Sequence, residues 1–257
     1  MEKQKKYVFI KTIKQSNTYK LNNINVLNYI IYMYYNNLYF IIIIQIFLAI
    51  IVYCSTLTLS IYNKNYLKRS LDYKYHIQCI INICITMIIY CIVYFHKDKL
   101  FTESIGISIQ NIIFYIIIVD TIIFWLHYYS HKIFKLKELF HMVHHDTYNI
   151  LPTDLFYTDF KEYLIYGVIV GVFPILFNKI NILDYLIANI LIFIHQIYTH
   201  SELSFPFYIP GFIHSKYHMK HHKIGKGNYS VLLPSWDKYM NTIIKTKKKK
   251  KKICKKK

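Results

Sequence analysis

The sequence predicts an all-α integral membrane protein, with about three to five membrane-embedded helices and a histidine-rich helical region on the cytosolic face. Three observations support this class. The chain of 257 residues is 54% hydrophobic and 18% aromatic, and its formal net charge of +19 is concentrated towards its two ends. Eleven of its thirteen histidines fall between positions 127 and 222. This length leaves room for one domain or one membrane unit.

Apolar stretches long enough to embed in a bilayer dominate the first half of the chain. A spanning helix needs about 20 consecutive apolar residues. The predicted spans are 38–61, 76–95 and 105–126, followed by two shorter and weaker stretches at 163–177 and 180–198. The two short stretches are expected to form a membrane hairpin over 163–199, because the histidines before and after them must meet on one side.

These patterns divide the chain into four regions. They are a basic N-terminal tail and interfacial segment (1–37), transmembrane helices (38–126), a histidine-bearing region that includes the hairpin (120–242) and a polylysine tail (243–257). The positive-inside tendency favours the cytosol for the loop 62–74 and for the tail. Three full spans before His127 would place the basic N-terminus on the opposite side, so the number of true spans stays open.

Lysines gather at both ends of the chain. Six lie between Lys3 and Lys20 and ten between Lys245 and Lys257, whereas the middle is nearly uncharged. Basic runs beside apolar segments suit anionic lipid headgroups. Nucleic-acid binding would require a basic face on a folded domain, which the sequence does not show. We therefore expect membrane lipids as partners and no nucleic acid.

The histidines recur at helical spacing, and residues three and four apart lie on one face of a helix. The three groups are His127 and His131; His141, His144 and His145; and His218, His221 and His222. His200, with His195 and His214 as weaker candidates, lies between the last two groups. Imidazole is a neutral ligand that suits iron, zinc and copper. Eight or more histidines exceed the needs of one four-coordinate zinc, so two metal ions are predicted.

Other histidine chemistries fit this pattern less well. No His-Glu-x-x-His occurs, so the helical zinc-protease arrangement is missing. A haem protein needs isolated axial ligands rather than triplets. A metal transporter would place its ligands inside its spans. A zinc-dependent membrane hydrolase and a non-catalytic metal-binding membrane protein remain as alternatives.

The order of these histidines resembles the fatty acid hydroxylase and sterol desaturase superfamily. The resemblance covers residues 120–242 and includes Asn228-Tyr229 and the segment 236–242. The segment 199–203 resembles alkylglycerol monooxygenase-like members and, more loosely, sterol methyl oxidase-like members. Glu162 stands where the family has the glutamate of His-Pro-x-Glu.

Asp120 matches an acidic residue that the family often has before its first histidine. It lies seven residues before His127 and on the same helical face as His127 and His131. We therefore expect Asp120 to orient a ligand histidine without binding the metal itself.

Three positions depart from the family pattern. Tyr128 stands where arginine is usual, Asp159-Phe160 replace His-Pro, and Asn241 replaces the glycine before Thr242. None of these changes removes a core histidine.

The resemblance implies a non-haem di-iron membrane oxidoreductase. Such an enzyme uses two iron ions, O2 and two electrons to hydroxylate or desaturate a lipid, here a sterol, a sphingoid or fatty acyl chain, or an ether lipid. The implied iron ligands are His127, His131, His141, His144, His145, His200, His218, His221 and His222, with His195 and His214 as weaker candidates. No His-Pro-Gly-Gly of a fused cytochrome b5 domain occurs, so a separate donor such as cytochrome b5 is expected. The resemblance also implies endoplasmic reticulum residence with a cytosolic active site.

Overall fold

The structure is a computed structural model of the chain. It describes residues 72–102, 106–133, 135, 137, 141–146, 150–201 and 209–245, with scattered positions between 47 and 58. The described secondary structure is helical apart from an isolated bridge between Thr102 and Asn181. The predicted all-α class is therefore confirmed. The predicted N-terminal tail, most of the span 38–61 and nearly all of the polylysine tail lie outside the described residues.

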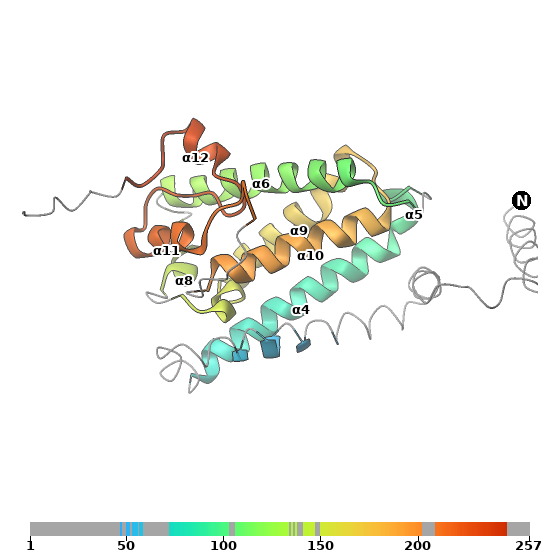
Figure 1. Cartoon of the computed structure of the whole chain (residues 1–257). Helices are drawn as coiled ribbons and strands as arrows, with labels where there is room; N and C mark the ends of the chain where they lie inside the picture. Colours follow the sequence, from blue (N-terminus) through green and yellow to red (C-terminus); the bar gives the residue numbers. More distant parts are fainter. Residues whose placement is uncertain are drawn as a thin grey trace, which may run out of the picture. The chain divides into compact units, whose positions relative to one another are not determined.

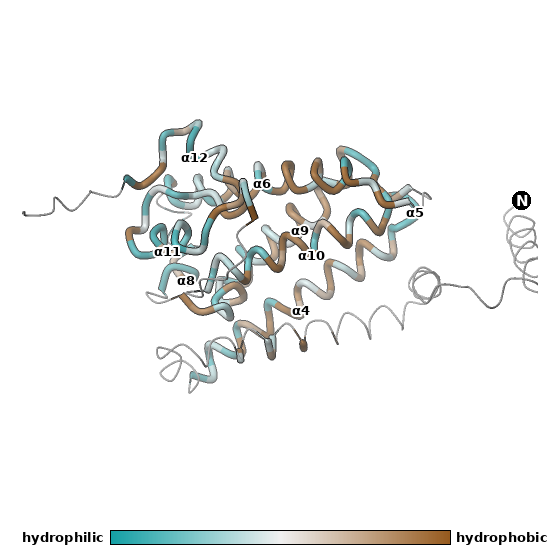
Figure 2. Tube along the Cα trace, in the orientation of Figure 1, coloured by the Kyte–Doolittle hydropathy of each residue, from teal (hydrophilic) through white to brown (hydrophobic). Residues whose placement is uncertain are grey.

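Four described helices are long and apolar enough to cross a membrane. They are α4 (Tyr73–Phe95), α6 (Ile109–Lys132), α9 (Phe160–Phe177) and α10 (Ile182–Thr199). Each contains most of one of the stretches predicted at 76–95, 105–126, 163–177 and 180–198. The two short stretches are complete helices of 18 residues. Figure 2 shows the hydrophobic residues concentrated along these long helices.

The polar elements gather at one end of the long helices. Figure 1 shows α8 (Met142–His145), α11 (Ser215–Ile224) and α12 (Ser235–Tyr239) at this end, and α5 (Lys97–Leu100) at the opposite end. A 3-10 helix, η4 (Pro152–Leu155), leads into α9 and contacts α10. The three histidine groups therefore lie at the same end of the helical bundle.

A short polar side chain caps the N-terminus of each long helix. An N-cap side chain accepts a hydrogen bond from a backbone N–H of the first turn, which otherwise has no partner. The caps are Asp72 for α4, Ser108 for α6, Asp159 for α9 and Asn181 for α10. Asp159 stands where the family has the histidine of His-Pro. This departure therefore keeps a helix start at the same place, by capping instead of by proline.

Helix α9 packs against both α4 and α6, and α10 packs against α6. At the α4–α9 contact, a Cβ added to Gly167 would lie 2.6 Å from Ile89 Cδ1, so glycine allows the two helices to approach. Asn82 of α4 donates to the carbonyls of Phe156 (2.8 Å) and Thr158 (2.9 Å) just before α9. These contacts fix the start of α9 against α4.

A buried carboxylate joins α6 to α10 at the end opposite the histidines. The Asp184 side chain accepts hydrogen bonds from Ser108 N (2.8 Å), Asn111 Nδ2 (3.0 Å) and Asn181 Nδ2 (2.7 Å). Asp184 is fully buried, and a buried charge is tolerated only when it is hydrogen-bonded in this way. The start of α10 is therefore held against the start of α6.

We predict that Gly167→Leu lowers stability, because its side chain would overlap Ile89. Overpacking of this kind costs roughly 1–3 kcal/mol. Thermal unfolding in detergent measures the loss. The double variant Gly167→Leu/Ile89→Ala is expected to recover part of it, and equal melting temperatures of the single and double variants would contradict the proposed contact.

Candidate metal centre

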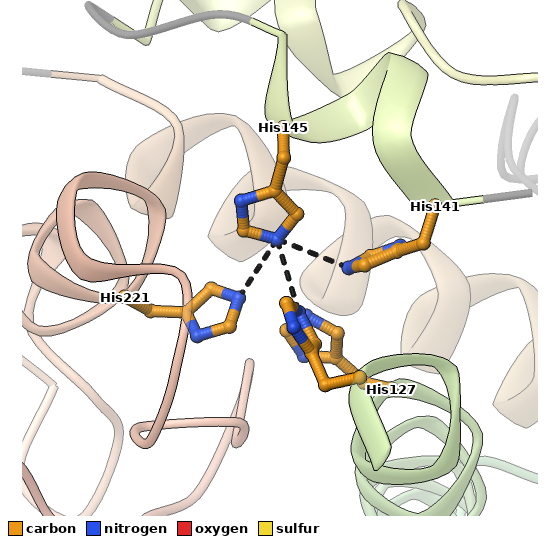
Figure 3. Close-up of side chains that lie close together, drawn as sticks. His127, His141, His145 and His221 are labelled. Atoms are coloured by element: carbon orange, nitrogen blue, oxygen red, sulfur yellow. Dashed lines mark hydrogen bonds between the residues drawn. The ribbon is translucent and has the colours of Figure 1, made fainter. Parts of the chain in front are cut away.

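Five histidines from three parts of the chain form a first group. His127 and His131 come from the end of α6, His141 and His145 from the turn of α8, and His221 from α11. One ring nitrogen from each lies within 4.8 Å of the corresponding nitrogens of the others. Figure 3 shows the rings of His141, His145 and His221 converging, with His127 beside them.

The nitrogen spacing in this group is that of metal ligands. His145 Nε2 lies 3.0 Å from His131 Nε2, and 3.1 Å from the Nε2 atoms of both His141 and His221. One ring nitrogen makes only one hydrogen bond, as donor or as acceptor, so three such contacts cannot all be hydrogen bonds. Around one ion with metal–nitrogen bonds of about 2.1 Å, neighbouring ligand atoms lie roughly 3.0–3.4 Å apart. The group therefore fits a shared metal ion.

Four histidines form a second group beside the first. They are His144, His200, His218 and His222. His218 Nε2 lies 3.3 Å from His200 Nε2 and 3.1 Å from His222 Nε2. The ring centroids of His145 and His222, one from each group, are 4.6 Å apart. The arrangement therefore fits two neighbouring ions.

In several of these histidines, the ring nitrogen Nδ1 is hydrogen-bonded to a backbone carbonyl oxygen. The Nδ1 partners are the carbonyl oxygen of Tyr229 for His127 (2.6 Å), that of Gly227 for His221 (2.7 Å) and that of Gln196 for His200 (2.8 Å). A carbonyl only accepts, so Nδ1 carries the proton and Nε2 keeps its lone pair. His127 Nε2 is buried without a hydrogen bond in the described structure, as a metal-facing nitrogen would be.

Glu162 holds the His141 ring. Its Oε1 lies 2.6 Å from His141 Nδ1, and its Oε2 accepts from Thr158 Oγ1 at 2.6 Å. A carboxylate behind a ligand histidine fixes the ring orientation and raises its basicity. Glu162 lies in the first turn of α9, so the capping of this helix by Asp159 also positions the site.

In the structure Asp120 makes a contact other than the expected one. Its Oδ1 accepts a hydrogen bond from Leu233 N at 2.9 Å. No hydrogen bond to a histidine is among its described contacts, and the Tyr229 carbonyl takes the orienting position behind His127. The orientation of a ligand histidine by Asp120 stays a prediction. Asp120 attaches the segment after Tyr229 to α6.

Asp237 organises the loop that supplies the carbonyls. Its fully buried carboxylate accepts from Tyr229 N (3.0 Å), Ser230 N (2.7 Å) and Tyr217 Oη (2.8 Å), and also from Thr242 Oγ1. The Tyr229 N–H is thereby bound to Asp237 while the Tyr229 carbonyl binds His127. Sequence reasoning gave no role to Asp237 or to the two carbonyls. The only signal was the family-like segments 228–229 and 236–242.

The backbone of this loop requires left-handed conformations. Gly227 has a φ of +73°, and a Cβ there would lie 2.6 Å from the Thr242 carbonyl oxygen. Asn241, which replaces the family's glycine, has a φ of +52°. Asparagine is among the non-glycine residues that adopt this conformation most readily. The departure at Asn241 therefore preserves the turn.

Burial keeps the clustered imidazoles neutral. Desolvation, reinforced by neighbouring histidines, lowers the pKa values of His141, His144, His218, His221 and His222 well below the ordinary value. Burial also lowers the pKa of His200 to about 4. Neutral imidazole is the form that binds metal, so the site is prepared for metal at neutral pH.

The two weaker candidates lie outside both groups. His195 is buried on α10, with its ring centroid 4.9 Å from that of Phe212. His214 caps α11, where its Nδ1 accepts a hydrogen bond from Lys216 N at 3.2 Å. The structure therefore gathers all nine stronger candidates and leaves these two aside.

A cavity of about 240 Å³ opens from the histidines into the bundle. His127, His144 and His200 line it at one end, and residues from α4, α6, α9 and α10 continue its wall. Most of that wall is apolar, and Gly167 and Gly171 form part of it.

The fatty acid hydroxylase family matches residues 112–242, just over half of the chain. The chain belongs to the fatty acid hydroxylase family. The resemblance to the superfamily is thus confirmed, and all nine clustered histidines of this fatty acid hydroxylase family member lie within the matched range. No curated protein and no solved structure matches the chain. The likeness to alkylglycerol monooxygenase-like and sterol methyl oxidase-like members stays a prediction.

We predict that Asp237→Ala weakens metal retention although Asp237 touches no clustered histidine. Loss of the carboxylate leaves buried N–H groups unpaired and releases the carbonyl behind His127. Mutation of the groups that hydrogen-bond and orient a metal ligand typically weakens metal affinity roughly 10–100-fold. Competition with a metal chelator measures this, with exposed Lys238→Ala as the neighbouring control. Equal metal retention in the two variants would count against the role of Asp237.

We predict that acid destabilises the metal-free protein. The folded-state pKa values of the clustered histidines lie below the unfolded value of about 6.5, so the unfolded chain binds more protons as the pH falls. Each such histidine costs about 1.4 kcal/mol between pH 7.5 and 5.5. Melting temperatures in detergent across this range should fall, and more shallowly for His218→Asn/His222→Asn. A flat profile for the unaltered chain would contradict this account.

Proposed function

We propose that this protein is a membrane-bound, O2-dependent di-iron oxidoreductase that hydroxylates or desaturates a lipid. The observation that carries the proposal is the pair of neutral histidine groups at the mouth of an apolar cavity between candidate membrane helices. The family supports an oxidoreductase. A lipid is the substrate that such a cavity suits, because it reaches the site from the bilayer.

The donor set supports iron over a single zinc. The groups contain five and four imidazoles, more than one tetrahedral zinc requires. Two bound irons would supply the activation of O2 that oxidation of an unactivated C–H bond needs. A zinc hydrolase would require a free general base, and both carboxylate oxygens of Glu162, which lines the cavity, are already hydrogen-bonded.

The chain itself would bind and orient the substrate. Ile123, Val170 and Phe193 line the cavity and can hold an apolar chain while excluding water. The carbon to be oxidised would lie at the end lined by His127 and His144. The Nδ1 hydrogen bonds hold His127 and His200 in fixed orientations during the reaction.

A separate electron donor such as cytochrome b5 completes the proposal. Helix α11 carries His218 and His222 on its buried side, whereas Lys216 and Lys223 are exposed. A helix with its side chains is about 10–12 Å across, so an acidic donor bound to these lysines would lie close to the histidines. We place this face in the cytosol and the protein in the endoplasmic reticulum, as the family resemblance and the lysine-rich segments favour.

Metal content of protein purified in detergent without added metal tests the proposal first. We expect about two irons per chain, as the two histidine groups imply. His145→Ala and His144→Ala are adjacent in sequence but belong to different groups, so each should lower the iron content, the first through the five-histidine group and the second through the four-histidine group. His96→Ala, at the exposed end of α4 beside α5, serves as the control and should retain both.

Oxygen uptake then separates the classes of enzyme. The iron-loaded chain should consume O2 when given a reductant and a lipid extract, and comparative lipidomics should identify the oxidised product. Zinc that cannot be exchanged for iron, with no O2 uptake, would favour a hydrolase. Absence of any bound metal in the unaltered chain would overturn the ligand assignment.

We predict that Lys216→Glu/Lys223→Glu weakens binding of the soluble domain of cytochrome b5. Reversal of charge on the exposed face of α11 replaces attraction with repulsion, mainly by slowing association at low salt. Surface plasmon resonance at two ionic strengths measures this. Lys99→Glu/Lys179→Glu makes the same charge change at the opposite end of the bundle. Equal losses in both double variants would contradict docking at α11.

A further inference from the structure

A polar amide interrupts the apolar wall of the cavity deep within α10. Asn189 lies on this candidate membrane span and lines the cavity together with Tyr185 and Gly171. The histidines lie at the other end of the same helix, where His200 ends α10. Polar side chains inside a membrane span are costly and usually functional. The question is which of the hydrogen-bonding groups of Asn189 the fold itself uses.

The fold uses both amide hydrogens. Asn189 Nδ2 donates to the Tyr185 carbonyl oxygen (2.8 Å) and to Tyr115 Oη (3.2 Å), and Tyr115 Oη donates in turn to the Val170 carbonyl oxygen (3.1 Å). A backbone carbonyl only accepts, so the amide cannot be turned around without losing the first of these bonds. Within the described structure, Asn189 Oδ1 makes no hydrogen bond. An amide oxygen that lines the cavity is left as an acceptor.

We propose that Asn189 Oδ1 accepts a hydrogen bond from a hydroxyl group of the lipid substrate. This inference rests on the proposed function and specifies its substrate class as a lipid alcohol that binds with its hydroxyl away from the metals. Eleven residues separate Asn189 from His200, which corresponds to roughly 16 Å along the helix. The oxidised carbon would therefore lie about that distance from the hydroxyl.

The cavity wall between these two ends matches the body of such a lipid. Ile192, Phe193 and Val170 line it and offer no hydrogen bonds from their side chains, although Tyr166 and Gln196 also line the cavity. A plain acyl chain that entered methyl end first would place a methyl group against Asn189, cover its half-buried side chain and leave its oxygen unpaired, which is unfavourable. A lipid with a hydroxyl at that end satisfies it. Sterols and long unbranched alcohols share this chemistry.

Binding of matched lipid pairs to the full-length protein in detergent tests the inference without turnover. The pairs are cholestanol with cholestane and hexadecan-1-ol with hexadecane, each differing by one hydroxyl. Comparing the unaltered protein with Asn189→Leu for the same probe cancels the partitioning of the probe into detergent. We expect Asn189→Leu to weaken binding of at least one alcohol roughly fivefold to tenfold and to leave its hydrocarbon unaffected. The alcohol that responds identifies the sterol or the unbranched class.

Tyr115→Phe is the control for a purely structural role. It removes the Tyr115 hydrogen bonds to Asn189 and Val170 but keeps the Asn189 oxygen and its fixed orientation. This variant should retain the preference for the alcohol. Equal weakening of alcohol and hydrocarbon by Asn189→Leu, or no response from either alcohol, would overturn the inference. Neither result depends on bound iron, so failure of the proposed oxidase activity would be seen separately in metal content and O2 uptake.

Discussion

Nine uncharged imidazoles at one end of a helical bundle form the constraint on which the rest of the structure depends. A buried ring nitrogen without a partner is costly, and a protonated one cannot bind metal. For His127 and His221 the protein meets both demands, because the carbonyls of Tyr229 and Gly227 bind their Nδ1 atoms. These carbonyls stay in place because Asp237 binds the same loop from its other side. A carboxylate with no described contact to a clustered histidine therefore helps to set the direction of His127.

The long helices contribute to the histidine groups in two ways. Their packing, closest where Gly167 meets Ile89, brings the end of α6 and the start of α9 to the histidines. They also leave a cavity whose wall belongs to all four candidate spans. The same bundle thus provides the rigid support for the ligands and the apolar space for a lipid. The histidines therefore lie at or just beyond one end of the candidate spans, with His127 and His131 in the last turns of α6.

Hydropathy located the four described long helices, because a membrane span must be apolar along most of its length. Helical spacing likewise selected eight of the nine histidines that cluster, and the family resemblance implied the ninth, His200. It did not reveal that His144 and His145 separate into different groups, because spacing places residues on a face and only tertiary packing decides which neighbour each one meets. The carbonyls that bind His127 and His221 could not be predicted either, because a backbone group has no sequence signature. The described partner of Asp120 could not be predicted for a related reason, because the sequence places Asp120 on a helix face but does not show that a backbone N–H meets it there.

The four-residue helix α8 limits which insertions, deletions and substitutions the sequence can accept at this point. It carries ligands of both groups on a single turn, from His141 at its start to His145 at its end. One inserted or deleted residue turns everything beyond it by about 100°. Such a change would withdraw ligands from both groups together, whereas a substitution at exposed Met142 would withdraw none. Exposed positions of this turn can therefore change in residue type, whereas its histidines and its length cannot change without loss of ligands.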